Sequence, residues 1–395
     1  VKDTLLALGA VAARYRERLP VTVVGITGSV GKTSTARMTT AVLATRLHVA
    51  ATKDDWNAEI GVPMMLLGLS ARTQVAVIEM AMRHLGDIHY LVEIARPSIG
   101  VVTNIAESHM ELLGSLENIV RAKGELIEGL PADGIAVLNA ADPLALGLQR
   151  LHRGRVLTYG MESAAAVRAA DITGHAQGST FRLMTPTGTI DMALPVPGWH
   201  QVSNALAACA VATALDVDLE GMREGLARYT TPKMRLQVMP LGAIDLINDA
   251  YNASPLSTRA ALAVLAEVAG PRRKLVVFGD MLELGSLAVA AHRAVGDEMA
   301  RAQIAGLVTI GDLARHVAER ARAGGVPEVV QAGTWQEGVE AITAMLRPGD
   351  VLLVKASRGM ALERVVEALV ARVDRVAAPP GRPEASSSNR LGCNG

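Results

Sequence analysis

The chain has 395 residues, of which half are apolar and only 3% are aromatic. Lysine and arginine together number 39, as do aspartate and glutamate, so the charge gives no sign of a nucleic-acid-binding protein. Cys209 and Cys393 are too few for a disulfide framework and have no metal-ligand spacing. No apolar run approaches the roughly 18 residues of a membrane span. We therefore expect a cytoplasmic protein with two or three domains.

The first part of the chain alternates short apolar strands with helix-patterned segments, which predicts a parallel sheet with crossover helices. An amphipathic helix is expected over residues 4–19, because Asp3 and a weak apolar core argue against a secretory signal. Polar and apolar residues alternate around a Thr-Gly turn over residues 180–196, which predicts an antiparallel hairpin. A helix is expected next, over about residues 202–215. The other strands are expected at residues 21–27, 75–79, 99–103 and 136–139.

A second series of strands and helices follows the proline-containing segment 229–240, which is interpreted as a junction near residues 232–240. Strands are expected at residues 243–248, 274–279, 306–310, 329–332 and 351–355. We therefore predict an N-terminal helix or linker over residues 1–20 and α/β domains over 21–236 and 237–375. The tail 376–395 is rich in proline, glycine and serine and is expected to be disordered.

The segment GITGSVGKTSTA, residues 25–36, places a glycine-rich turn between an apolar strand and a helix-compatible run. Such a turn directs backbone N–H groups and the positive end of a helix dipole toward one point, which suits a phosphate. Lys32 would reach the outer phosphates, and the Thr33 hydroxyl would ligate Mg²⁺. Ile26 occupies the first glycine position of the strict phosphate-loop pattern, so a turn without a ligand is the alternative. The sequence has no Asn-Lys-x-Asp motif of the kind expected in a GTPase.

Two further strand ends carry candidate metal ligands. Glu79 ends the strand VAVIE, and His109 lies in the loop after the next predicted strand. Ligands of doubly wound sheets lie beyond the carboxyl ends of the strands, so both side chains are expected beside the glycine-rich turn. The alternative for each is an ordinary surface residue.

Lys123 is the more informative residue. On a helix over residues 116–130 it lies four residues after Ile119 and four before Ile127, within the apolar stripe. Either its stem is buried while the amine reaches water, or the amine is desolvated and its pKa is lowered. A neutral amine near a divalent cation can capture CO₂ as a carbamate, which converts a cation into a metal-bridging anion.

Longer motifs resemble those of the Mur ligases of peptidoglycan synthesis. In the first half these are GITGSVGKTSTARM, EIGVPMMLLGLS, the stretch from VIEMAM to RAKGEL, and IAVLNAADP. In the second half they are INDAYNASPLSTRAAL, VVFGDMLELG and LLVKASRGMALERVVEAL, which resemble the members that add D-Ala-D-Ala to UDP-MurNAc-tripeptide. The resemblance covers about residues 1–372. It implies an α/β protein with a central P-loop ATPase domain on a mostly parallel sheet and a Rossmann-like C-terminal domain.

The resemblance also implies the chemistry of a ligase. ATP would phosphorylate a peptide carboxylate, and the amine of D-Ala-D-Ala would attack the acyl phosphate. ATP and two Mg²⁺ ions are the implied cofactors. One ion would be held by Thr33 and Glu79, and the other by Glu79, His109 and a carbamate on Lys123. The implied catalytic residues are Lys32, Glu79, His109 and Lys123.

The remaining implied residues bind nucleotide or substrate. Asn204, with His200 near it, would read adenine, Arg235 would meet the γ-phosphate and Asp249 the ribose. The alternatives are that Asn204 caps its helix or faces solvent, that Arg235 forms a salt bridge at the rim of the site, and that Asp249 is an ordinary polar residue at a strand end. The implied nucleotide-binding set is Gly28, Ser29, Gly31, Lys32, Thr33, Ser34, His200, Asn204, Arg235 and Asp249, and the implied substrate-binding set is Asn57, Tyr251, Asn252, Lys355, Ser357 and Arg358.

Two features depart from the resemblance. The family's enzyme has an N-terminal domain that seats the UDP-sugar, whereas this sequence opens about twenty residues before the glycine-rich turn. A truncated sequence, a separate chain that supplies this domain in trans, and a different acceptor are the three explanations. Asp55 and Ala58 stand where asparagines are expected. The alternative functions are therefore a stand-alone ligase with another carboxylate acceptor and a nucleotide-binding paralogue without activity.

Overall fold

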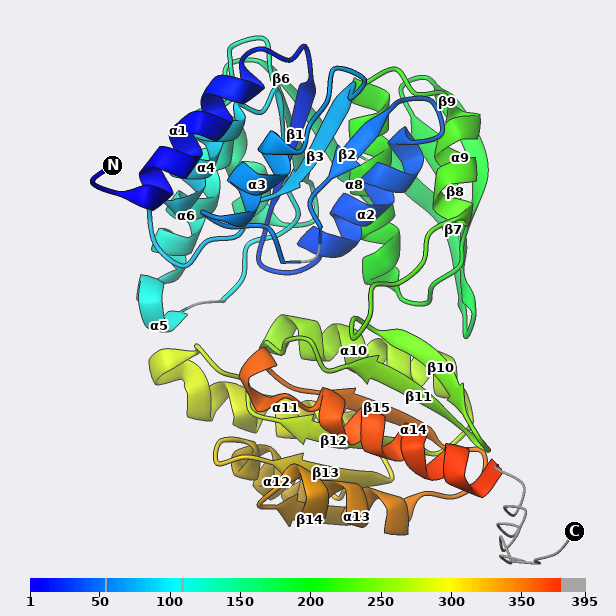
Figure 1. Ribbon diagram of the computed structural model, residues 1–395. Helices are drawn as coiled ribbons and strands as arrows, with labels where there is room; N and C mark the ends of the chain where they lie inside the picture. Colours follow the sequence, from blue (N-terminus) through cyan, green and yellow to red (C-terminus); the bar gives the residue numbers. More distant parts are fainter. Residues whose placement is uncertain (54, 108–109, 163, 378–395) are drawn as a thin grey trace, which may run out of the picture.

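The computed structural model describes residues 1–53, 55–107, 110–162 and 164–377. Two lobes follow one another along the chain, each built on a sheet with helices against it (Figure 1). The first lobe contains the sheet of residues 22–194 with the helices up to residue 227, and the second lobe contains the sheet of residues 237–355. The predicted α/β fold class is confirmed.

The sheet of the first lobe has nine strands within the described residues, in the order β2-β3-β1-β4-β5-β6-β7-β8-β9. Its strands are β1 (Thr22–Thr27), β2 (Val49–Ala51), β3 (Val75–Glu79), β4 (Ile99–Val102), β5 (Ile135–Asn139), β6 (Arg155–Gly160), β7 (Val167–His175), β8 (Gly178–Thr185) and β9 (Gly188–Leu194). Neighbours from β2 to β7 are parallel, and β7, β8 and β9 are antiparallel. The central strands are apolar throughout because helices cover both faces of the sheet.

The helices of the first lobe divide between these two faces. They are α1 (Thr4–Arg16), α2 (Lys32–Leu43), α3 (Gly61–Leu67), α4 (Asp87–Ala95), α5 (Met110–Leu113), α6 (Leu116–Glu128), α7 (Pro143–Gly147), α8 (Trp199–Ala214) and α9 (Leu219–Ala227), with the 3-10 turn η1 (Leu148–Leu151). Helices α2, α8 and α9 share one apolar core with the sheet, and α1, α3, α4 and α6 share the other (Figure 1). The helices α2 and α6 thus approach the same strands from opposite sides.

The register of the first sheet brings three strand ends together. Strand β1 lies between β3 and β4, with Ile26 beside Glu79 and Thr27 beside Val102. Because these strands are parallel, the turns that follow them leave the sheet at one edge. This edge faces the second lobe (Figure 1).

The second lobe has a six-stranded sheet within the described residues, in the order β10-β11-β15-β12-β13-β14. Its strands are β10 (Gln237–Leu241), β11 (Ile244–Asp249), β12 (Lys274–Gly279), β13 (Gly306–Ile310), β14 (Glu328–Ala332) and β15 (Val351–Lys355). Its helices are α10 (Pro255–Ala269), α11 (Ala288–Arg301), α12 (Ala314–Ala323), α13 (Trp335–Met345) and α14 (Glu363–Ala377), with the 3-10 turns η2 (Gly285–Leu287) and η3 (Arg358–Met360). Only the pair β10–β11 is antiparallel among these neighbours.

The sequence-based predictions match most of these elements. The nine strands predicted as single segments are confirmed to within one residue at each end, and the hairpin is confirmed as β8–β9. Strand β10 was not predicted, because the segment 229–240 that contains most of it was interpreted as a junction. Pro240 made this strand hard to predict, and the structure accommodates it because β10 is an edge strand. Strands β2, β6 and β7 were not predicted; β2 has only three residues, too few to show a pattern.

The two lobes touch at several places around a shared cleft. The backbone N–H of Glu111 donates to the carbonyl of Glu283 (3.2 Å). The Tyr251 hydroxyl of the second lobe donates to Asp55 Oδ1 of the first lobe. No helix in the described residues is long and apolar enough to cross a membrane.

Candidate active site

The glycine-rich turn lies between the end of β1 and the start of α2. Gly31 caps α2 with a positive φ of 89°, and Gly28 has a φ of 149°. A Cβ atom on Gly28 would lie 1.8 Å from Thr103 Oγ1, and one on Gly31 would lie 2.5 Å from Asn204 Oδ1. The turn therefore needs glycine at both positions, for backbone conformation and for space.

The loop after β4 holds this turn in place. The turn was predicted from the sequence, but its contacts with this loop were not. Asn104 Oδ1 accepts from the backbone N–H of Val30 (2.9 Å), and the Thr103 hydroxyl donates to the carbonyl of Val30 (2.7 Å). The signal in the sequence is the polar pair directly after the apolar strand. These bonds hold the turn in place while the first N–H groups of α2 stay available to a ligand.

Lys32 folds back over the turn, where its Nζ donates to the carbonyl of Gly28 (2.9 Å). Burial lowers the pKa of the Lys32 amine, the positive charge of Arg235 lowers it further, and Glu79 opposes both effects. Two cations thus approach one another beside a helix N-terminus. A polyphosphate would relieve their repulsion.

Glu79 is the buried carboxylate of the site, with an exposed fraction of 3%. Its Oε2 accepts from the Thr33 hydroxyl (2.7 Å), and its Oε1 accepts from Asn57 Nδ2 (3.0 Å). Its backbone N–H donates to the hydroxyl of Thr52 (2.8 Å). A hydroxyl and a carboxylate side by side at a phosphate turn are oxygen ligands of the kind that Mg²⁺ binds, so Thr33 and Glu79 fit one metal site.

Lys123 lies within α6, which packs so closely on β1 that a Cβ on Gly25 would lie 2.9 Å from Leu126 Cδ1. The side chain is 2% exposed, so it is buried rather than extended to water. Burial lowers the pKa of its amine well below the ordinary value, and the charge of Lys32 acts in the same direction. Burial thus favours the uncharged form of the amine, which is the form that can react with CO₂.

The predicted second metal site is only partly described by the structure. His109 lies outside the described residues. Among the residues that are described, no group of three His, Cys, Asp or Glu side chains is placed to hold a metal ion. The ligand set of Glu79, His109 and modified Lys123 therefore stays a prediction.

Two predicted adenine-binding residues lie on α8 beside the turn. Asn204 Oδ1 accepts from the Thr35 hydroxyl (3.3 Å), and its Nδ2 donates to Gln201 Oε1 (3.1 Å). His200 Nε2 is buried and has no hydrogen-bond partner within the described part of the chain. Burial and the charge of Lys355 lower the pKa of His200 to about 4. A neutral imidazole nitrogen without a partner suits the polar edge of a nucleobase.

In the second lobe, Asp249 and Lys355 form a buried ion pair at the ends of β11 and β15. Lys355 Nζ donates to Asp249 Oδ2 (2.5 Å) and to the carbonyl of Asn252 (2.9 Å). Asp249 Oδ1 accepts from the backbone N–H of Leu236 (3.0 Å). Burial raises the pKa of Asp249, and Lys355 opposes this shift. The pair holds together the segments before and after β11, and the Lys355 side chain is only 1% exposed.

The loop after β15 contributes the other predicted substrate residues. The Ser357 hydroxyl accepts from the N–H of Leu282 (2.9 Å) and donates to the carbonyl of Ala253 (3.3 Å). Arg358 pairs with Glu363 (2.6 Å), and its side chain is 55% exposed. Of the two, Arg358 is therefore the better placed to meet a carboxylate from solvent.

A cavity of about 870 Å³ between the lobes brings most of the predicted residues together. Gly28, Lys123 and Lys355 are not in its lining. Residues that line it but were not predicted include Asp55, Arg83, His84 and Glu283. The predicted residues that line it are Ser29, Gly31, Lys32, Thr33, Ser34, Asn57, Glu79, His200, Asn204, Arg235, Asp249, Tyr251, Asn252, Ser357 and Arg358.

Comparison with protein families agrees with this arrangement. The Mur ligase middle domain matches residues 26–212, and the Mur ligase, glutamate ligase domain matches residues 234–358. The chain belongs to the Mur ligase family. The residue ranges of the two matches fall on the first and second lobes respectively.

Similar proteins with known names indicate which members of the family this chain resembles. The UDP-N-acetylmuramoyl-tripeptide–D-alanyl-D-alanine ligase of Bacillus subtilis is 37% identical to this Mur ligase, over 94% of this chain and 80% of its own. The enzyme of the same name from Escherichia coli is 38% identical, over 93% and 81%. Among solved structures, MurF from Acinetobacter baumannii has a TM-score of 0.87 at 32% identity, over 94% of this chain and 81% of its own. MurF from Thermotoga maritima, solved with ADP, has a TM-score of 0.85 at 25% identity, over 95% and 86%.

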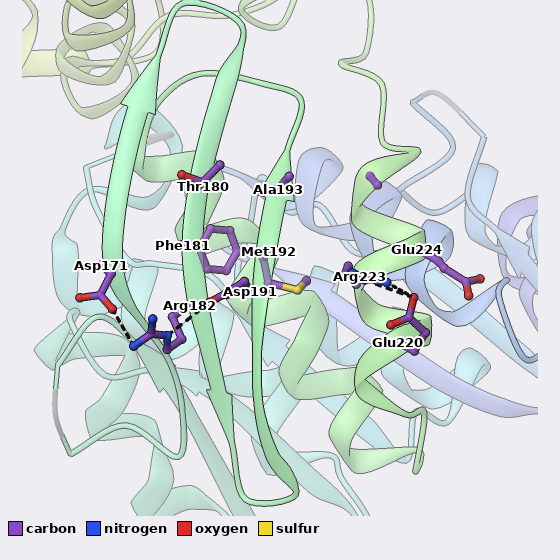
Figure 2. Close-up of a pocket in the computed structure, with 11 residues that line it drawn as sticks. Asp171, Thr180, Phe181, Arg182, Asp191, Met192, Ala193, Glu220, Arg223 and Glu224 are labelled. Carbon is purple, nitrogen blue, oxygen red and sulfur yellow. Dashed lines mark hydrogen bonds and ion pairs between the residues drawn. The ribbon is translucent and has the colours of Figure 1, made fainter.

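A second hollow of this Mur ligase lies away from the cleft, between the hairpin β8–β9 and α9 (Figure 2). Most of its charged side chains pair with one another, Arg182 with Asp171 and Asp191, and Arg223 with Glu220. Glu224 pairs instead with Arg46, outside the hollow. It shares no lining residue with the cleft. We therefore assign the active site to the cleft.

Proposed function

We propose that this Mur ligase joins D-Ala-D-Ala to UDP-MurNAc-tripeptide at the expense of ATP. The observation that carries the proposal is one cavity lined by a phosphate turn, the Thr33–Glu79 pair and polar residues of both lobes. The names of the relatives that cover most of the chain support the choice of substrates.

ATP binding is derived from the first lobe and the segment that connects the lobes. The N–H groups at the start of α2 meet the β- and γ-phosphates, and Lys32 turns from the Gly28 carbonyl toward their oxygens. Arg235 adds a second positive charge. Helix α8 would hold the adenine, since His200 Nε2 there is buried without a partner in the described residues.

Mg²⁺ fits this site at Thr33 and Glu79, and a second ion fits if Glu79, His109 and a carbamate on Lys123 hold it. When bound, these ions neutralise charge on the phosphoryl oxygens. The Lys123 amine forms a bond to the carbon of CO₂ and loses a proton, which leaves a carbamate anion. Burial favours this reaction because it lowers the pKa of the amine and so disfavours its charged form.

The reaction proceeds in two steps that the cleft can accommodate. A carboxylate oxygen of the tripeptide attacks the γ-phosphorus, and the bond to the bridging oxygen breaks to give an acyl phosphate and ADP. The amine of D-Ala-D-Ala then attacks the acyl carbon, and phosphate leaves as the amine loses its proton. Lys32 and Arg235 hold phosphate charge in both steps, so the chain contributes mainly positioning and electrostatic stabilisation.

The second lobe supplies the amine side of the cleft. Arg358 would bind the free carboxylate of the dipeptide, and Asn252 lies at the same rim. Lys355 would not touch the dipeptide but would hold Asp249 and the backbone of Asn252 in place, through its ion pair with Asp249 and its hydrogen bond to the carbonyl of Asn252. The cytoplasmic location stays a prediction from the sequence, and a UDP-binding domain supplied by a separate chain stays one of the three explanations given above.

Phosphate release from ATP tests the proposal. We expect release by the purified chain only when UDP-MurNAc-tripeptide and D-Ala-D-Ala are both present. Lys32→Ala should reduce kcat/KM by roughly 100-fold or more, because a charge that stabilises the transferred group is lost. No release above background with both substrates would reject the proposal. Release with a different carboxylate would identify another acceptor.

The same assay tests the carbamate. Lys123→Ala should abolish turnover, and short carboxylic acids should partly restore it by supplying the missing anion. Loss of turnover with no restoration by any such acid, in a variant that still binds nucleotide, would contradict the carbamate.

A further inference from the structure

The segment that connects the lobes presents Arg235 in an unusual backbone setting. Met234 and Leu236 both have left-handed conformations, with φ of 59° and 55°. Residues other than glycine adopt such conformations only when surrounding contacts hold them, and they concentrate at functional sites. Here the carbonyl of Met234 accepts from the N–H of Tyr251 (3.1 Å), and the N–H of Leu236 donates to Asp249 (3.0 Å). Both flanks of Arg235 are thus tied to the end of β11.

Tyr251 also contacts the Arg235 side chain. The guanidinium carbon lies 3.8 Å from the centre of the Tyr251 ring, which is a close cation–π contact. A guanidinium stacked on a ring keeps its N–H groups free at the edges to meet an anion. The ring therefore limits the directions in which Arg235 can point.

The hydroxyl of Tyr251 reaches the other lobe. It donates to Asp55 Oδ1, and Asp55 lies two residues before Asn57, which donates to Glu79. Asp55 belongs to the first lobe and lines the cleft, so this hydrogen bond joins the two lobes. The contacts run from the first lobe through Tyr251 to Arg235.

Arg235 in turn faces the phosphate turn. Arg235 and Lys32 line the same cavity, Lys32 at the turn and Arg235 on the segment that connects the lobes. Lys32 covers the turn itself, so a second cation on the cavity side meets the outermost phosphate.

We propose that Tyr251 is a positioning residue: its ring holds Arg235 against the outermost phosphate of the nucleotide, and Asp55 holds the ring when the lobes meet. The inference rests on the proposed function in that it takes ATP as the nucleotide. It explains why a strained connection lies next to an aromatic residue that bridges the cleft. It also gives Asp55 a role that needs only an acceptor oxygen.

Nucleotide discrimination is the measurement that tests this. The Kd of ADP and of a non-hydrolysable ATP analogue are compared by calorimetry in the presence of Mg²⁺. Tyr251→Leu should weaken the analogue about tenfold and ADP less than about twofold, since only the analogue carries the outermost phosphate. Tyr251→Phe keeps the ring and loses the hydroxyl, so it should weaken the analogue by about threefold.

Variants of Asp55 test whether the hydrogen bond between Tyr251 and Asp55 is responsible for the change in Kd. Asp55→Ala should match Tyr251→Phe, and the double variant should be no worse than either one, because both remove one hydrogen bond. Asp55→Asn retains an acceptor oxygen and should therefore weaken the analogue less than Asp55→Ala does. The matched control is Tyr15→Phe, which removes a tyrosine hydroxyl bonded to the carbonyl of Leu69, away from the cleft, and should leave both Kd values unchanged.

Equal weakening of ADP and the analogue in Tyr251→Leu would overturn the proposal, as would independent losses in the double variant. These outcomes do not depend on turnover. If wild-type protein releases no phosphate yet shows the expected Kd ratios, the proposed ligase reaction fails while the role of Tyr251 stands.

Discussion

His200 is a residue of this site whose side chain lacks a hydrogen-bond partner within the described protein. Its Nε2 is buried without a partner in the described residues, and burial with the nearby Lys355 lowers its pKa to about 4. Lys32 and Lys123 likewise have lowered pKa values because burial removes water from their amines. Such groups destabilise the free protein, and they are found where a ligand later supplies the missing interaction.

The lowered pKa of His200 predicts a loss of stability in acid. In the unfolded chain the imidazole takes up a proton near its ordinary pKa of 6.5, whereas in the folded protein it stays neutral down to about 4. The unfolded state therefore binds more protons between these values, so folding stability falls as the pH is lowered from 6.5 toward 4. The contribution of this residue should decrease by about 2 kcal/mol between pH 7 and pH 4.5.

Urea unfolding of wild type and His200→Asn at both pH values measures this contribution. Other groups titrate in both proteins, so the difference between the two isolates His200. Wild type should lose about 2 kcal/mol more than the variant in acid. Identical losses would contradict a neutral buried imidazole.

Single residues also show what the sequence could reveal. Lys123 was singled out because it lies in an apolar stripe, which left open whether its amine reaches water, and the structure places it 2% exposed. The burial of Lys355 was not foreseen, because its partner Asp249 is more than 100 residues away and the sequence does not show which strand ends face one another. Asp55 was noticed only as a departure from a motif, and its contact with Tyr251 depends on how the lobes meet.

At the scale of elements, the phosphate turn depends on how tightly β1, α2 and the loop after β4 fit together. Gly28 has no room for a side chain, since a Cβ would lie 1.8 Å from Thr103 Oγ1 and 3.2 Å from the backbone nitrogen of Asn104. Gly28→Ala should push this loop away and displace the turn. We expect a loss of about 1–3 kcal/mol in stability and of measurable ATP-analogue binding.

Gly349→Ala is the matched control for this substitution. Gly349 also has a positive φ, of 89°, but a Cβ there would meet no atom within 4 Å. It should cost only the backbone term, about 1 kcal/mol, and leave nucleotide affinity unchanged. Thermal unfolding and calorimetry with the analogue check both variants, and equal behaviour of the two would show that the contact with Thr103 is unimportant.

The elements themselves were largely predictable because apolar strands between turns have a clear pattern. The contacts between elements were not. The bonds from Thr103 and Asn104 to Val30 depend on β1 and β4 being neighbours, which follows from the strand order rather than from either segment. The sequence therefore predicted which loops gather at the sheet edge, and the structure was needed for their mutual contacts.

For the whole molecule, the lobes meet at separate points around the cleft. The bond from Glu111 to Glu283 and that from Tyr251 to Asp55 both involve chain segments at the surface. Interfaces of this kind permit relative motion of domains. A ligand that contacts both lobes therefore stabilises the closed arrangement by its differential affinity for it.

Closure of the lobes on substrates is accordingly the prediction that concerns the whole molecule. An acyl phosphate hydrolyses if water reaches it, so the second lobe should close over the phosphate turn once ATP and the tripeptide are bound. Small-angle X-ray scattering should show a smaller radius of gyration and a shorter maximum dimension when an ATP analogue and UDP-MurNAc-tripeptide are added together. Lys32→Ala is the control, because it weakens the nucleotide contact in the first lobe while leaving the second lobe unchanged, and its profile should respond far less at the same concentrations. A wild-type profile that is the same with and without both ligands would mean that the lobes are already fixed, and water would then have to be excluded by the substrates alone.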